Sequence, residues 1–89
     1  MLRPTGSDPG DWAGTHITFQ HLGPRSGNKT SDFYVRNSKD RGVIGTVKWF
    51  GRWRKYSFFP EPGTVYEETC LREIAEFCQA RTTDHKKGI

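Results

Sequence analysis

The stretch DFYVRNSKDRGVIGTVKWFGRWRKYSFFP, residues 32–60, carries the clearest strand pattern of the sequence. Asp32–Asn37 is dense in aromatic and β-branched residues, SKDRG supplies turn residues, and Val43–Phe50 resumes the β pattern. Gly51–Arg54 offers a second reversal before Lys55–Phe59, and the prolines that follow stop that strand because proline cannot continue a ladder. These residues predict a three-stranded antiparallel meander.

One C-terminal helix should follow the meander. Thr64 and Glu67 have the spacing of a capping box, which places the start of the helix near Val65 or Glu67. Apolar side chains then recur at the spacing of one helix face: Cys70, Leu71, Ile74, Ala75, Phe77 and Cys78. The charged residues Glu68, Arg72, Glu73 and Glu76 fall on the other side. The predicted fold class is therefore α+β, a meander packed on an amphipathic helix.

The first thirty residues have the composition of a linker. Eight of them are Gly or Pro, and apolar residues make up 33% of the whole chain, below the roughly 45–50% of ordinary globular chains. Ile17 and Phe19 alternate with polar residues, so an edge strand or an arm that orders on binding is also compatible with this segment. We expect a mostly disordered or arm-like segment over residues 1–30, a β-β-β-α domain over 31–82 and a disordered tail over 83–89.

Charge is distributed unevenly along the chain. Residues 31–60 carry seven Lys or Arg against two Asp, a net charge of +5, whereas residues 61–82 carry five Glu against two Arg, a net charge of −3. A basic middle beside an acidic helix points to an anionic partner more specifically than the overall net charge of +4 does.

Alternation along the strands sorts the meander into two faces. The set able to receive the helix is Phe33, Val35, Val43, Val47, Trp49, Tyr56 and Phe58. The set pointing away is Tyr34, Arg36, Ile44, Thr46, Lys48, Phe50, Trp53 and Lys55, which mixes cations with aromatic rings. A β-bulge near Gly45 or Gly51 would exchange the faces.

Cations beside exposed rings suit nucleic acid, because Lys and Arg neutralise phosphates and aromatic faces stack on bases. The expected nucleic-acid-binding residues are Tyr34, Arg36, Lys48, Phe50, Trp53, Arg54 and Lys55. Three alternatives stay open. The rings could anchor a protein partner, a small anionic nucleotide could lie between Arg54, Lys55 and nearby rings, or the aromatics could serve only to bury surface in a small domain.

Other chemistry finds little support in the sequence. Within one helix the eight residues from Cys70 to Cys78 span about 12 Å, beyond the roughly 7 Å limit for a disulfide. The three His residues are scattered and no CxxC occurs, so we expect no metal and no cofactor. No nucleophile meets a placed base, which favours a binding protein over an enzyme. No apolar run is long enough to span a membrane, and we expect a soluble, cytoplasmic protein that is a monomer or a weak dimer.

Two local patterns resemble known proteins. Gly45–Phe50 (GTVKWF) with the later FFPEPG looks like the opening of a bacterial cold-shock domain, but the Gly-Phe-Gly-Phe strand of that family is replaced here by Lys55–Phe58 (KYSF), so we reject its barrel. The pattern WRKYSFFP followed by CLREIAEF, within Trp53–Phe77, is similar to small uncharacterised proteins of bacteria and their phages. That resemblance implies a sheet-plus-helix module and carries no activity.

Overall fold

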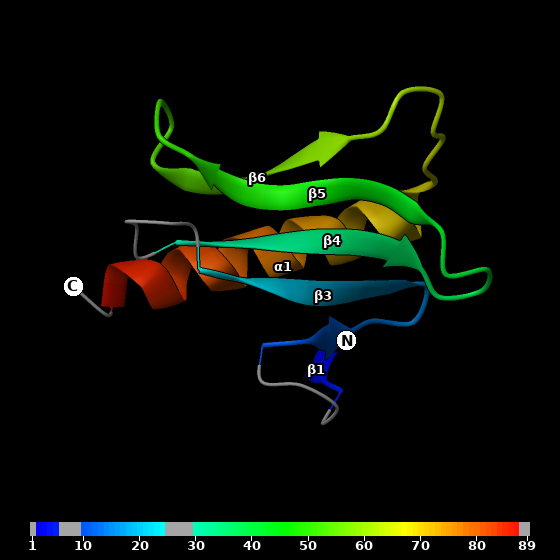
Figure 1. The fold of residues 1–89 in the computed structure, drawn as a ribbon, viewed down its shortest axis with the longest axis horizontal. Helices are drawn as coiled ribbons and strands as arrows, with labels where there is room; N and C mark the ends of the chain where they lie inside the picture. The colour runs from blue at the N-terminus through cyan, green and yellow to red at the C-terminus, as the bar shows by residue number, and fades with distance from the viewer. Residues whose placement is uncertain (1, 6–9, 25–29, 88–89) are drawn as a thin grey trace.

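The sheet is the main element of the computed structural model, which describes residues 2–5, 10–24 and 30–87. Its strands are β1 (Arg3–Pro4), β2 (Trp12–Ala13), β3 (Ile17–Pro24), β4 (Ser31–Asn37), β5 (Val43–Phe50) and β6 (Lys55–Pro60), and the helix α1 spans Glu68–Lys87. All neighbouring strands are antiparallel, and their spatial order follows the chain. In Figure 1 the strands β3, β4 and β5 pass in front of α1, which lies along one face of the sheet.

The prediction of a three-stranded meander with a flexible N-terminal segment was wrong. The sheet has six strands, because Arg3–Pro4 contributes β1 and residues 10–24 contribute β2 and β3. β3 pairs with β4 from Ile17 opposite Asn37 to Pro24 opposite Ser31. Residues 1, 6–9 and 25–29 of the predicted arm lie outside the described residues. At the other end, α1 continues through Lys87, into the stretch 83–89 that was expected to be a tail.

The core explains why β3 belongs to the sheet. Ile17 and Phe19 are fully buried, and the Phe19 ring stacks on Phe77 of α1 with centroids 4.0 Å apart and planes 7° from parallel. Phe33 of β4 meets the same Phe77 ring edge-on at 4.9 Å. Without β3, the Phe77 face of the helix would be left against water, and aromatic burial of this size dominates the stability of small domains.

A buried carboxylate fastens the N-terminal strands to the helix. The sequence placed Glu73 on the solvent side, but it is 6% exposed and accepts hydrogen bonds from the backbone amides of Thr15 (2.8 Å) and His16 (3.2 Å). A Cβ at Gly14 would lie 2.4 Å from Glu73 Oε1, so the close approach requires glycine at this position. The helix therefore recognises the β2–β3 turn through its backbone, which residue patterns do not reveal.

The helix also covers part of the exposed edge of β6. The Tyr56 amide donates to Thr82 Oγ1 (2.9 Å), and the Thr82 hydroxyl donates in turn to the Cys78 carbonyl (2.9 Å). Pro60, further along β6, has no amide hydrogen to offer. At these two positions β6 offers no free amide to another chain, which weakens the edge as a template for pairing.

A β-bulge corrects the predicted faces at one point. Val35 pairs with Gly45 but Arg36 pairs with Val43, so the register skips Ile44. Val43 therefore turns outward and is exposed, while Ile44 packs against the core, the reverse of the simple alternation. A Cβ at Gly45 would meet the Phe58 ring at 2.4 Å, so the ring occupies the space that a side chain would need.

Candidate nucleic-acid interface

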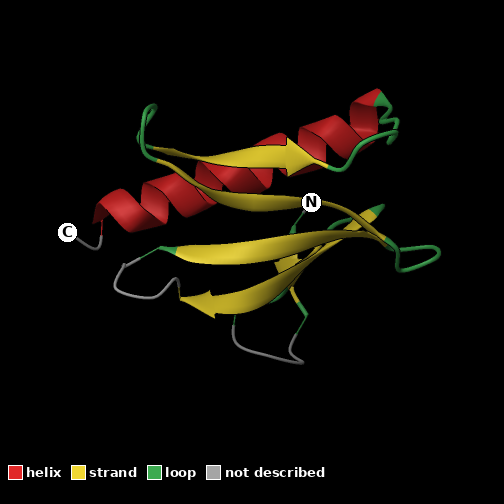
Figure 2. Cartoon of the chain, turned by 45° about the horizontal axis from the view of Figure 1, so that its top comes forward, coloured by secondary structure: helices red, strands yellow, loops and turns green. Residues whose placement is uncertain are grey.

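The face of the sheet opposite α1 carries no described element, and we call it the open face (Figure 2). Pairing across the strands places side chains in rows on this face, since directly opposed residues of an antiparallel sheet share a side. One row runs from Gln20 through Tyr34 and Thr46 to Phe59, and the next joins Lys48 to Ser57. Phe50 and Lys55 form the last row, beside the β5–β6 turn.

Aromatic rings form a connected group on the open face. Phe50 lies edge-on to Trp53 of the following turn at 4.9 Å and to Phe59 of β6 at 6.1 Å. Trp53 is 65% exposed and Tyr34 is 38% exposed, whereas Phe50 and Phe59 are half-buried. The group therefore combines rings fixed by their neighbours with rings that water can reach.

Two cations are held against this group. The Lys48 ammonium lies 4.5 Å from the centroid of the Phe59 ring, and the Arg36 guanidinium lies 5.7 Å from that of Tyr34. Arg36 is fixed further, because its Nε donates to Gln20 Oε1 (2.9 Å) and one terminal nitrogen donates to the Arg41 carbonyl (2.8 Å). A guanidinium fixed in this way keeps further donors for an anion and loses little entropy on binding.

Charge on the open face is mainly positive. Arg36, Lys48 and Lys55 are spread over β4, β5 and β6, and alternation adds the carboxylate of Asp32 to the same face. The two turns that border the face contribute the exposed basic residues Lys39, Arg41, Arg52 and Arg54. The acidic side chains Glu67, Glu68 and Glu76 belong instead to the helix layer, so an anion meets a favourable potential from the sheet side.

The structure brings most of the sequence-predicted site residues together. Tyr34, Arg36, Lys48, Phe50 and Lys55 share the open face by register, and Trp53 joins them through Phe50. Arg54 separates from them: it borders a depression with Trp49, His85 and Lys86 on the helix side of the turn. Lys55, at the edge strand, also borders a second depression beside α1.

Sequence reasoning missed two contributors. Phe59 lies under the Lys48 ammonium, yet it is the last residue of the predicted third strand and was assigned to neither face. Gln20, which holds Arg36, belongs to β3, a strand that was not in the predicted sheet. The strict alternation of β6 from Tyr56 and Phe58, both directed at the core, could have placed Phe59 on the open face.

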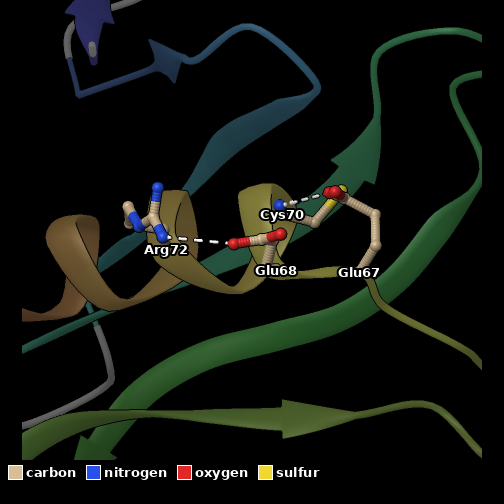
Figure 3. A network of polar contacts seen from close by, with 4 residues as sticks. All are labelled: Glu67, Glu68, Cys70 and Arg72. Atoms are coloured by element: carbon tan, nitrogen blue, oxygen red, sulfur yellow. Dashed lines mark hydrogen bonds and ion pairs between the residues drawn. The ribbon is translucent and has the colours of Figure 1, made fainter.

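The start of the helix is capped by a residue other than the one predicted. Glu67 Oε1 accepts a hydrogen bond from the Cys70 amide at 2.7 Å (Figure 3). Thr64 instead donates its hydroxyl to the Glu61 carbonyl. The amides of Cys70 and Thr69 hold the pKa of the Glu67 carboxyl at about 2. Figure 3 also shows Arg72 reaching back to Glu68, an exposed pair at 3.4 Å.

Neither thiol is activated. Both cysteines are free, burial raises the pKa of Cys78 to about 11, and burial together with the hydrogen bond to Glu67 raises the pKa of Cys70. Among the residues that the structure describes, no cluster of three His, Cys, Asp or Glu could hold a metal ion. Within the same ranges, no helix is long and apolar enough to cross a membrane.

Fold and surface together define a small α+β protein whose antiparallel sheet has one helix-covered face and one open face. The chain is 30% identical over 61 residues to an uncharacterized 9.3 kDa protein of Acholeplasma phage L2, a match that covers 68% of this chain and 78% of the phage protein. The chain belongs to the family of that phage protein, in line with the resemblance to phage proteins read from the sequence. No protein-family profile matches the chain. No solved structure matches it.

Proposed function

We propose that this protein binds single-stranded nucleic acid through the open face of its sheet. The observation that carries the proposal is the placement of cations beside aromatic rings on one face: Lys48 over Phe59 and Arg36 over Tyr34, with the largely exposed Trp53 against Phe50. In such a surface the cations neutralise phosphates and the rings stack on bases, each stacked base contributing roughly 1–3 kcal/mol.

The preference for single strands follows from shape and from the rings. Four neighbouring strands, β3 to β6, span about 14 Å at the usual strand spacing, wider than the major groove of B-DNA at about 12 Å. The open face cannot enter that groove flat. Moreover, Trp53 and Tyr34 contribute stacking energy only if the bases are unpaired and free to turn toward the protein. A duplex would meet the cations alone and bind more weakly.

Salt dependence with a matched pair of variants tests the proposal. The first variant, Arg36→Gln/Lys48→Gln/Lys55→Gln, removes three positive charges from the open face. The second, Arg3→Gln/Arg72→Gln/Lys87→Gln, removes three exposed charges from β1 and α1, outside the strands β3 to β6, and leaves the same net charge. Fluorescence anisotropy with a labelled oligothymidylate should show a large affinity loss and a salt slope shallower by about 2 for the first variant, at about 0.7 per lost phosphate contact.

Equal affinity losses in the two variants would contradict the proposal, because binding would then follow net charge and not position. Absence of oligothymidylate binding even at low salt would contradict the proposal and favour the alternative in which Trp53 anchors a protein partner. Tighter binding to a duplex of the same length than to the single strand would contradict the preference for unpaired bases.

A further inference from the structure

A second surface lies on the other side of the β5–β6 turn. A depression of about 260 Å³ is lined by Trp49, Arg54, His85 and Lys86, which come from the end of β5, the turn and the last turn of α1. Trp49 pairs with Tyr56 on the helix-facing side of the sheet, so this depression is separate from the open face. The turn presents Trp53 to the open face and Arg54 to the depression.

The depression is built for an anion. The imidazole of His85 rests on the Trp49 ring, with centroids 4.5 Å apart and planes at 48°, and Arg54 and Lys86 supply permanent positive charge beside it. Asp84, the neighbouring acidic residue, is turned into an ion pair with Arg81 at 2.8 Å. The partial negative charge of the helix end is offset by the basic residues of that last turn, which include Lys87.

The backbone at Arg54 gives an independent reason to look for a role of its side chain. Arg54 has φ +54°, in the left-handed region, and its amide closes the turn by donating to the Phe50 carbonyl at 2.9 Å. Glycine adopts this left-handed backbone conformation most easily, because a Cβ atom is unfavourable there. A strained non-glycine residue beside a cationic depression is typical of a functional position.

We propose that this depression binds a phosphate monoester. Arg54 can offer a two-pronged donor to two phosphate oxygens, Lys86 a point charge and His85 a ring N–H, while the Trp49 ring forms an apolar wall. A phosphate monoester carries about −1.5 to −2 charges at neutral pH, more than a backbone phosphodiester, and so gains more from three converging basic groups. The group could be the terminal phosphate of a nucleic-acid strand or belong to a free nucleotide.

NMR separates these sources. The protein, with its Trp indole N–H and amide signals assigned, is titrated with thymidine 5′-monophosphate, with 5′-phosphorylated oligothymidylate and with the same oligonucleotide ending in a 5′-hydroxyl. Shifts at Trp49 and His85 with both phosphorylated probes support a general phosphate-monoester site. Shifts with the 5′-phosphorylated oligothymidylate, but not with thymidine 5′-monophosphate or the 5′-hydroxyl oligonucleotide, support a terminal-phosphate site. If neither phosphorylated probe shifts Trp49 and His85, the proposal is overturned.

A pair of single-charge variants tests the role of Arg54. Arg54→Gly removes the guanidinium at a backbone position that suits glycine, so the fold should persist, and affinity for the phosphorylated probe that shifts Trp49 should fall about tenfold, as expected for loss of charge-assisted hydrogen bonds. Arg72→Gln removes an exposed charge on the solvent side of α1 and should leave that affinity nearly unchanged. Equal behaviour of the two variants overturns the assignment to Arg54.

The outcome is independent of the function proposed above. Failure of the open face is seen as absent shifts at Tyr34, Lys48 and Phe50 with any oligonucleotide, whereas failure of the phosphate site is seen at Trp49 and His85. The 5′-hydroxyl oligonucleotide reports on the first surface, and thymidine 5′-monophosphate on the second.

Discussion

The two faces of the sheet carry the same kinds of aromatic residue in different surroundings. On the covered face, rings such as Phe19, Phe33 and Tyr56 pack against one another and against Phe77 of the helix, and they are buried. On the open face, Tyr34 and Trp53 remain accessible, and cations lie beside the rings. Aromatic content alone therefore does not separate the rings that stabilise the core from the rings that we propose to bind nucleic acid, whereas the surroundings of each ring differ.

Truncating the covered face should have the largest effect. Phe77 is 1% exposed and contacts Phe19 and Phe33, so Phe77→Ala is expected to lower the free energy of unfolding by about 3–5 kcal/mol, through lost burial and the cavity left behind. Urea unfolding followed by circular dichroism measures the change. A loss below about 1 kcal/mol would mean that the helix does not pack on the sheet as described.

Removing the carboxylate that joins the helix to the β2–β3 turn should have the second largest effect on stability. Glu73→Ala leaves the amides of Thr15 and His16 without their carboxylate partner and should cost about 2–3 kcal/mol. Hydrogen exchange at those two amides should accelerate more than exchange within β4 and β5. Glu76→Ala, an exposed position one turn along, is the matched control, and a similar exchange pattern in both variants would contradict the role of Glu73.

Truncation of a ring on the open face should weaken binding of single-stranded nucleic acid and leave stability nearly unchanged. Trp53→Ala is expected to change the free energy of unfolding by no more than about 0.5 kcal/mol, while single-stranded binding weakens by roughly 5- to 150-fold, the equivalent of 1–3 kcal/mol of stacking. Leu71→Ala, which truncates an exposed apolar side chain on the helix, should leave both quantities nearly unchanged. A Trp53→Ala variant that is strongly destabilised and still binds the oligonucleotide would contradict the placement of Trp53 in the binding surface.

The smallest effect is expected in how the free energy of unfolding depends on pH in acid, through Glu67. Because the folded-state pKa of Glu67 is about 2, below its ordinary value of 4.5, its contribution is complete above about pH 4.5 and is lost as the pH falls toward 2. Glu67→Gln should therefore flatten the decline of stability in this window. Glu68→Gln leaves the Cys70 amide bonded to Glu67 and should keep the decline of stability between pH 4.5 and 2. If urea titrations give both variants the same dependence of the free energy of unfolding on pH, the capping role of Glu67 is contradicted.

Local patterns predicted the hairpins of residues 32–60 and the amphipathic helix, because alternation and apolar spacing are properties of neighbouring residues. The alternation of Ile17 and Phe19 indicated at most an edge strand or an arm, and β1 and β2 escaped prediction. Order in this segment depends on distant partners, because Phe19 needs Phe77 and the β2–β3 turn needs Glu73. Low apolar content suggested disorder, yet a sheet with one open face buries only one of its sides and needs fewer apolar residues.

Five of the seven expected site residues share the open face because strict alternation holds across the centre of β4 and β5. Alternation failed at Val43 and Ile44, where one extra residue in the strand exchanges the sides. Arg54 could not be placed from sequence, since a turn residue in the left-handed region directs its side chain away from the strand pattern.

The most direct test of the open face is an amide NMR titration with a short single-stranded oligonucleotide at low and at moderate salt. If the open face binds the oligonucleotide, shifts should cluster at Tyr34, Arg36, Lys48, Phe50 and Trp53 and reverse as salt rises, with the solvent side of α1 unaffected. Shifts confined to the helix, or no shifts at low salt, would contradict the claim that the open face is the binding surface.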